Sequence, residues 1–267
     1  MLIAKRIFFH HPAYIEEEKY ETEYIFRGEE MKKNKLKLIA LILAVSFLAL
    51  AGCAQGPTET REESVSGFNR VEIETFGEFL ISQGETETLT IEGPRDYLRY
   101  ITADVENGTL YIKTRRGFVG GPVQRVTYTL TVKDLNAISF SGAGSVKLYS
   151  MEASDFSADL SGAGSIEIDE LIAESLSLNL SSAGAVVIAG KVKTQDVNLS
   201  GLGSYEGGDL RSEDARINLS GAGSAVVWAE NSLDVNVSGV GSVAYYGNPV
   251  LTQNISGLGS VNSKGEH

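Results

Sequence analysis

The segment Ser220-Gly-Ala-Gly-Ser224 is one copy of a short motif that recurs seven times in this chain and decides its fold. The copies begin at regularly spaced serines: Ser141, Ser161, Ser181, Ser200, Ser220, Ser238 and Ser256. Successive starts lie 20, 20, 19, 20, 18 and 18 residues apart. A constant period of this length indicates an array in which each repeat forms one layer of the structure.

Apolar residues flank every copy at fixed distances. One precedes the motif: Phe140, Leu160, Leu180, Leu199, Leu219, Val237 and Ile255. Others follow it at alternate positions: Val146, Ile166, Val186, Tyr205, Ala225, Val243 and Val261, then Leu148, Ile168, Ile188, Val227 and Tyr245. A further set lies in mid-repeat: Met151, Leu171, Val192, Leu210 and Val250. Alternation is typical of strands with one buried face, so we expect about three short strands per repeat.

This pattern predicts an all-β fold, a parallel β-solenoid (single-stranded β-helix) with coils of about 18–20 residues. We expect it to be right-handed, because right-handed crossovers predominate and the hexapeptide pattern of left-handed solenoids is missing from the sequence. Since glycine lets the backbone turn without a Cβ clash, we assign structural turns to Gly142, Gly144, Gly162, Gly164, Gly184, Gly201, Gly203, Gly221, Gly223, Gly239, Gly241, Gly257 and Gly259. We expect the second glycine of each motif to hold a positive φ or another φ restricted to glycine.

A polar residue lies two positions before each motif: Ser139, Asp159, Asn179, Asn198, Asn218, Asn236 and Asn254. Alternation directs these side chains outward, where stacked asparagines can hydrogen-bond from coil to coil. Five of them also begin Asn-X-Ser sequons. We interpret the row as a structural ladder rather than as glycosylation sites, because acceptor sites lie on surface loops and these lie in predicted strands.

The N-terminal part of the chain carries an export signal. Residues 31–52 combine four lysines with an apolar stretch over residues 38–50, which is typical of a signal peptide. Leu50-Ala-Gly-Cys53 resembles a bacterial lipobox, so we predict a diacylglycerol on Cys53 and cleavage after Gly52; the alternative is an uncleaved membrane anchor. Cys53 is the only cysteine, so no disulfide can form within the chain. Ala54 directly follows the predicted lipidated cysteine, and in a Gram-negative cell this resembles the pattern that directs a lipoprotein to the outer membrane.

The predicted organisation has six parts. Residues 1–30 do not fit the signal, and Gly28-Glu29-Glu30 can be encoded by a purine-rich run resembling a ribosome-binding site, so we interpret this leader as mis-annotated. After the signal peptide, residues 53–64 are the lipid anchor and a polar linker. Residues 65–135 form an N-terminal cap or the first coils, with a hairpin at Asn107-Gly108. Residues 136–262 are the solenoid and 263–267 a tail.

Composition limits the chemistry. From Cys53 onward the chain has 15 Lys+Arg against 28 Asp+Glu, a net charge of −13, which argues against nucleic acid as a partner. Its histidines are His10, His11 and His267. The predicted solenoid therefore lacks the groups for Ser-His-Asp or Cys-His catalysis and for His/Cys zinc sites, and we predict no metal and no cofactor.

Two other patterns favour structure over chemistry. Gly142-Ala-Gly144 is similar to a fragment of a phosphate loop, but it recurs in every repeat without a following helix, which indicates a turn. Carboxylates are the only plausible catalysts, and one group includes nearby arginines: Asp209, Arg211, Glu213, Asp214 and Arg216. We interpret this group as solvated surface and assign no catalytic residue.

The first third of the chain contains segments whose order is similar to that of a known protein family. Gly67-Phe68 is followed by Gly108-Thr-Leu-Tyr-Ile112, by Tyr128-Thr-Leu-Thr-Val132 and then by the motif array. This order, over about residues 65–262, resembles the DUF2807 family, also called the putative auto-transporter adhesin head GIN domain. The resemblance implies an exported bacterial β-solenoid, often a lipoprotein, with no established enzymatic activity. Ser181-Ser-Ala-Gly-Ala185 departs from the motif, so its corner is expected to be tighter or differently hydrated.

Two functions are compatible with the sequence. The first is a membrane-anchored, non-enzymatic β-solenoid of the cell envelope that binds a glycan or an envelope protein, or serves as a scaffold. The alternative is a carbohydrate-active β-helix enzyme, a polysaccharide lyase or hydrolase. A cleft with converging carboxylates would favour the enzyme, whereas a regular surface would favour the first function.

Overall fold

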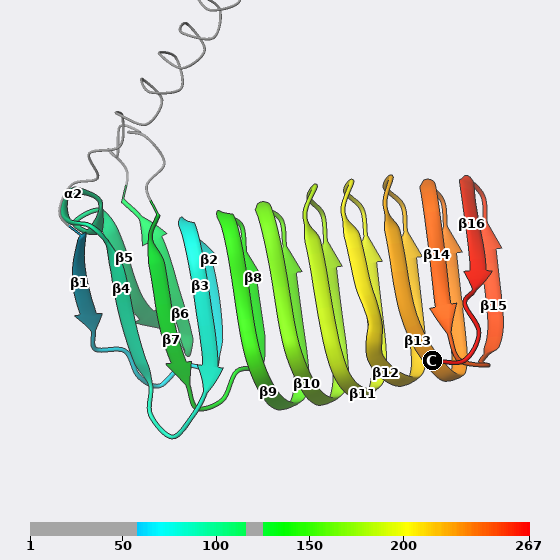
Figure 1. Cartoon of the computed structure of the whole chain (residues 1–267), viewed down its shortest axis with the longest axis horizontal. Coiled ribbons are helices and arrows are strands. Elements are labelled where there is room, and N and C mark those ends of the chain that lie inside the picture. The colour runs from blue at the N-terminus through cyan, green and yellow to red at the C-terminus, as the bar shows by residue number, and fades with distance from the viewer. Residues whose placement is uncertain (1–57, 116–124) are drawn as a thin grey trace, which may run out of the picture. The chain divides into compact units, whose positions relative to one another are not determined.

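A computed structural model describes residues 58–115 and 125–267 of the chain. Within these residues, strands stack side by side as successive coils (Figure 1), and pairing is continuous from β1 (Thr58–Glu63) to β16 (Leu258–Ser263). The prediction of an all-β parallel β-solenoid is confirmed. The leader, the signal peptide and Cys53 lie outside the described residues.

Each regular coil is a single long strand that bends in its middle. These strands are β9 (Ala143–Leu160), β10 (Ala163–Leu180), β11 (Ala185–Leu199), β12 (Ser204–Leu219) and β13 (Ser224–Val237). The expected three short strands per repeat are therefore wrong: pairing with the next coil continues through the bend, so β9 and β10 are each one element. The last coils are divided into β14 (Val240–Tyr246), β15 (Val250–Ile255) and β16 (Leu258–Ser263).

The coils stack in register, with motif over motif. Ser145 pairs with Ser165, which pairs with Ala185, and the row continues through Ser204 and Ser224. Each coil has two long sides joined by the motif at one edge and by the bend at the other (Figure 1). We call these two edges the corner edge and the bend edge.

The N-terminal region forms both a coil and a cap. β2 (Arg70–Glu74) and β3 (Phe76–Gln83) make one coil, and they pair in parallel with β8 (Ala137–Phe140) and β9. On their other side lie β6 (Thr109–Thr114) and β7 (Thr127–Val132), also parallel. Antiparallel strands then close this end: β1 (Thr58–Glu63), β4 (Thr88–Pro94) and β5 (Ile101–Glu106), with the one-turn helix α2 (Arg95–Leu98) after β4.

Two local predictions for this region have different outcomes. The hairpin is confirmed, because β5 and β6 are antiparallel and both Asn107 and Gly108 have positive φ, 51° and 75°. The linker prediction is wrong at its C-terminal end, since Thr58–Glu63 is a strand that pairs with β4. The Arg61 guanidinium secures this strand by donating to the carbonyl oxygens of Leu98 (2.5 Å) and Ile101 (3.1 Å).

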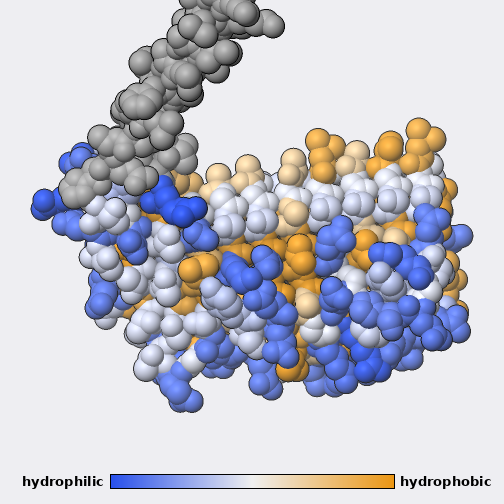
Figure 2. All heavy atoms as spheres, viewed as in Figure 1, coloured by the Kyte–Doolittle hydropathy of each residue, from blue (hydrophilic) through white to orange (hydrophobic). Residues whose placement is uncertain are grey.

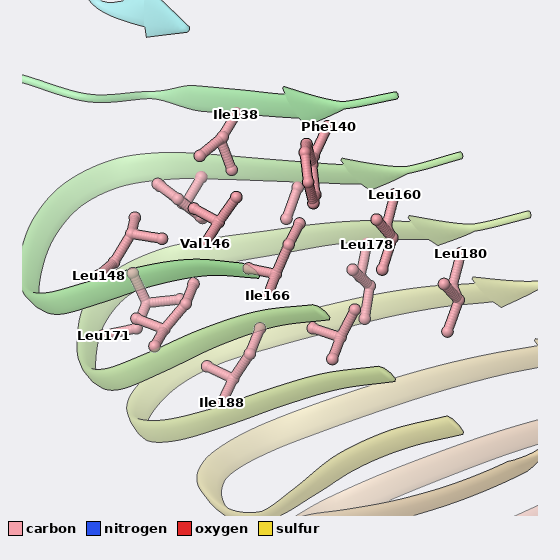
Figure 3. Packing of buried hydrophobic residues seen from close by; sticks show 14 of the residues in the cluster. Ile138, Phe140, Val146, Leu148, Leu160, Ile166, Leu171, Leu178, Leu180 and Ile188 are labelled. Carbon is pink, nitrogen blue, oxygen red and sulfur yellow. The ribbon is translucent and has the colours of Figure 1, made fainter. Parts of the chain in front are cut away.

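The core lies between the two long sides of the coils, whose apolar side chains point toward one another (Figure 3). The predicted inward residues of β8 to β13 are buried, and all belong to one continuous cluster. Residues 55–267 are one compact unit, so this cluster is a core of their own. Such a unit is expected to fold without the preceding residues.

The last coil departs from the predicted core. Ile255 is 39% exposed, because β15 pairs only with β13 and no further coil covers it. Val250 is 76% exposed and pairs with the outward Ser232, whereas its neighbour Leu251 lies in register with the buried Leu233. The inward position of this coil is therefore Leu251 and not Val250.

The motif glycines are required mainly by the close stacking of the coils, and the expectation of positive φ is largely wrong. Among the glycines at the fourth position of the seven motifs, Gly144 alone has a positive φ, 131°. At Gly223, a Cβ would lie 2.2 Å from the carbonyl oxygen of Gly203 in the preceding coil. In the atypical third motif, the hydroxyl of Ser182 is buried and has no hydrogen-bond partner in the described part of the chain.

Candidate interaction surfaces

The predicted asparagine ladder is confirmed as an outward row on one long side of the solenoid. Each amide nitrogen donates to the coil before it: Asn179 Nδ2 to Asp159 Oδ1 (2.7 Å), Asn198 to Asn179 (3.2 Å), Asn218 to Asn198 (3.0 Å) and Asn236 to Asn218 (3.3 Å). Strand register extends the row to Ser139 and Asn254. Because these amides satisfy one another, the ladder links the coils and presents a regular polar surface.

Charged side chains also pair from coil to coil. The pairs are Lys147 with Glu167 (2.9 Å), Lys193 with Glu174 (2.6 Å) and Arg211 with Glu230 (2.7 Å). The hydrogen bond from Arg211 lowers the pKa of the Glu230 carboxyl below its usual range. Exposed pairs of this kind contribute little to stability. Their main effect is therefore on the charge pattern of the surface.

The group of carboxylates and arginines between positions 209 and 216, which the sequence offers for carboxylate chemistry, does not converge on one site. Its members make separate contacts: Asp209 with His267 (3.0 Å), Arg211 with Glu230, Asp214 with Ser232 (2.5 Å) and Arg216 with Asp234 (3.5 Å). Glu213 instead lines a polar groove at the bend edge. Within residues 58–115 and 125–267, no group of three or more His, Cys, Asp or Glu side chains is arranged to hold a metal ion.

A buried polar network, which the sequence analysis missed, lies in the core of β11 and β12. The Tyr205 hydroxyl donates to Gln195 Oε1 (3.0 Å), and Gln195 Nε2 donates to Ser212 Oγ (2.8 Å). Ser212 Oγ donates to the Trp228 carbonyl oxygen (2.7 Å). A signal for this network exists in the sequence, because Gly207 replaces an inward aliphatic residue; a Cβ there would lie 2.3 Å from the Tyr205 hydroxyl.

We expect the unit to lose stability at alkaline pH. Burial raises the pKa of Tyr205 and of Tyr128, since the phenolate is poorly solvated in the core. Above the ordinary tyrosine pKa of about 10, the unfolded chain releases these protons while the folded chain keeps them, so the free energy of unfolding falls. Each tyrosine contributes up to about 1.4 kcal/mol per pH unit.

Urea unfolding of residues 55–267 between about pH 9 and pH 11 measures this slope. Tyr205→Phe should make the decline shallower. An identical decline in Tyr205→Phe and the wild type would contradict the assignment of this effect to the buried phenol.

The motif residues form an uncharged surface along the corner edge. A shallow groove follows this edge and is lined by motif residues from several coils, including Leu202 and Val240. In Figure 2, hydrophobic atoms gather along the upper margin of the C-terminal coils, where these motifs lie. This surface is less polar than the charged bend edge on the opposite side of the coils.

The stacked coils and their outward ladders define a class of protein. It is a β-solenoid with a repetitive surface on which the carboxylates do not converge. A family model described as "Putative auto-transporter adhesin, head GIN domain" (DUF2807) matches residues 67–249, and the chain belongs to this family.

Solved structures share the fold. A "putative adhesin" from Bacteroides fragilis is 26% identical with a TM-score of 0.75, and the alignment covers 78% of this chain and 97% of that one. A "putative lipid binding protein" from Parabacteroides distasonis is 24% identical with a TM-score of 0.58, covering 78% and 97%. A "putative adhesin" from Parabacteroides merdae is 18% identical with a TM-score of 0.59, covering 78% and 96%. Comparison with the curated proteins finds no match.

The resemblance to this adhesin-like family is thus confirmed, and the family points to the cell surface or envelope. Among the described residues, no helix has the length and apolar character needed to span a bilayer. The proteins similar to this chain are named for adhesion or lipid binding rather than for an enzymatic activity.

Proposed function

We propose that this chain is an exported lipoprotein of the cell envelope whose solenoid is a non-enzymatic adhesion or binding module. The observation that carries the proposal is the regular surface of the coils, on which the asparagine ladder continues from coil to coil and charged pairs link several neighbouring coils. A surface that repeats at the strand spacing suits an extended or repetitive partner such as a glycan or an envelope protein. Membership of an adhesin family supports this function.

The lipid anchor is supported by the lipobox and by the start of the fold. Strand β1 begins at Thr58, five residues after Cys53. A diacylglycerol at Cys53 would therefore hold the solenoid directly above a membrane, the outer membrane if the host is Gram-negative. Several acyl chains on one cysteine would give stable attachment.

We expect Cys53→Ser to abolish the lipid-modified N-terminal peptide that begins at residue 53, because serine has no thiol to form the thioether and cleavage follows lipidation. Ala54→Ser is the matched control, because it changes the next residue and leaves the acceptor thiol. Cell fractionation followed by mass spectrometry of the N-terminal peptide measures both effects. A wild-type N-terminal peptide that carries no lipid on Cys53 would contradict lipid anchoring.

The binding role is tested separately with residues 55–267 on a glycan array and in attachment assays with cells that carry or lack the protein. The alternative enzyme is tested with the same unit and a panel of polysaccharides. Turnover that disappears in Asp209→Asn or Asp214→Asn would establish the enzyme instead. The dispersed contacts of these two carboxylates favour the binding module.

A further inference from the structure

The corner edge carries an exposed apolar ridge. The third residue of every motif is exposed, and the row reads Ala143, Ala163, Ala183, Leu202, Ala222, Val240 and Leu258. Its large members lie at the C-terminal end, where Leu202 is 70% exposed, Val240 55% and Leu258 80%. Leu202 and Leu258 are three coils apart, about 14 Å at the usual strand spacing. Single exposed aliphatic residues are common, but an aligned row of them marks an interaction surface.

The ridge is also free of charge. All seven motifs consist only of Ser, Gly, Ala, Leu and Val, although the chain from Cys53 onward has a net charge of −13. Around the last four motifs, Glu206 is the one charged residue within two positions of a motif. Acidic and basic side chains are instead found on the bend edge, for example Glu174 and Lys193. The corner edge can therefore approach an anionic surface with little repulsion.

The chain enters the solenoid at this same edge. Strand register places Thr60 beside Glu92, Glu92 beside Thr127, Thr127 beside Glu78, and Glu78 beside Ser145 of the first motif. Thr58 thus lies at the corner edge. The five residue steps from Cys53 to Thr58 can span at most about 18 Å when fully extended.

We propose that the corner edge is a membrane-docking surface, with Leu202, Val240 and Leu258 in the boundary between lipid headgroups and acyl chains. The orientation rests in part on the proposed lipid anchor, since a lipid on Cys53 would emerge beside this edge. In this arrangement the solenoid lies along the bilayer, and the asparagine ladder and the bend edge stay accessible to a partner. The uncharged ridge and the position of Thr58 favour a bilayer over a second copy of the chain as the occupant.

The test uses residues 55–267, which contain no cysteine, so that single labels can be introduced. Leu258→Cys carries an environment-sensitive fluorophore on the ridge, and Ile172→Cys carries it on the bend edge, where the native isoleucine is 46% exposed. An N-terminal hexahistidine tag tethers each protein to vesicles of phosphatidylethanolamine, phosphatidylglycerol and a nickel-chelating lipid. This tether replaces Cys53, so the result does not depend on lipidation.

We expect a blue-shifted emission at position 258 that a lipid-borne quencher suppresses, and neither effect at position 172. Without the tag, Leu202→Ser and Leu258→Ser should each lower the vesicle partition coefficient about tenfold, whereas Ile172→Ser should leave it unchanged. Equal behaviour of the two labels would overturn the proposal. A blue shift at position 258 that appears without vesicles when the protein concentration is raised would also overturn the proposal. It would indicate that a second copy of the chain covers the ridge. Neither of these two outcomes would test the lipid anchor, which the Cys53→Ser variant tests separately.

Discussion

Replacing Gly144 with alanine is expected to lower the free energy of unfolding of residues 55–267 by about 4 kcal/mol. Gly144 has a φ of 131°, which L side chains rarely adopt, and a Cβ would lie 2.0 Å from the carbonyl oxygen of Gly77. Backbone strain at such a position costs about 1–3 kcal/mol. Forcing two packed coils apart lowers the free energy of unfolding by about another 1–3 kcal/mol.

The matched variant is Gly223→Ala, which meets a similar obstacle, the Gly203 carbonyl oxygen at 2.2 Å, but has no positive φ. We expect it to lose about half as much stability, because only the stacking of the coils is disturbed. Chemical unfolding with a common m-value compares the two variants. If Gly144→Ala unfolds at the same denaturant concentration as the wild type, the coils are not stacked as closely as the structure shows.

Replacing Gln195 with leucine is expected to lower the free energy of unfolding by about 1–3 kcal/mol, although leucine is more apolar. Gln195 Oε1 accepts the hydrogen bond of the Tyr205 hydroxyl, and Tyr205 is fully buried. Leucine at position 195 would leave this hydroxyl in the core without its acceptor, and the cost is that of an unpaired buried polar group. Tyr205→Phe should have a cost of similar size, because it leaves Gln195 Oε1 unpaired.

The double variant Gln195→Leu and Tyr205→Phe distinguishes this explanation from a general loss of packing. Replacing both partners with apolar groups removes the unpaired atoms, so the double variant should be more stable than either single variant. The coupling energy from the double-mutant cycle should be about 1 kcal/mol or more. Additive losses would show that the Gln195–Tyr205 hydrogen bond does not stabilise the core.

The regular coils were predictable from the sequence because their signal is local. The motif at Ser141, Ser161 and its successors, together with alternate apolar residues such as Ile166 and Ile168, determines a strand, a buried face and a turn within each repeat. Stacking identical repeats then leaves one register, with motif above motif, which also places the asparagines in a ladder. The sequence by itself thus determined the fold class, the repeat length and most of the core.

Features that depend on contacts between distant residues were decided only by the tertiary structure. The burial of Gln195 depends on Tyr205, Ser212 and Trp228 in neighbouring coils, and a glutamine read alone is expected on the surface. The pairing of β1 with β4 turned part of a polar linker into a strand. The apolar ridge likewise exists because seven third residues, about 20 positions apart in the sequence, align along the same edge at which β1 begins. Composition cannot show such alignments, since they arise from the register of the whole stack.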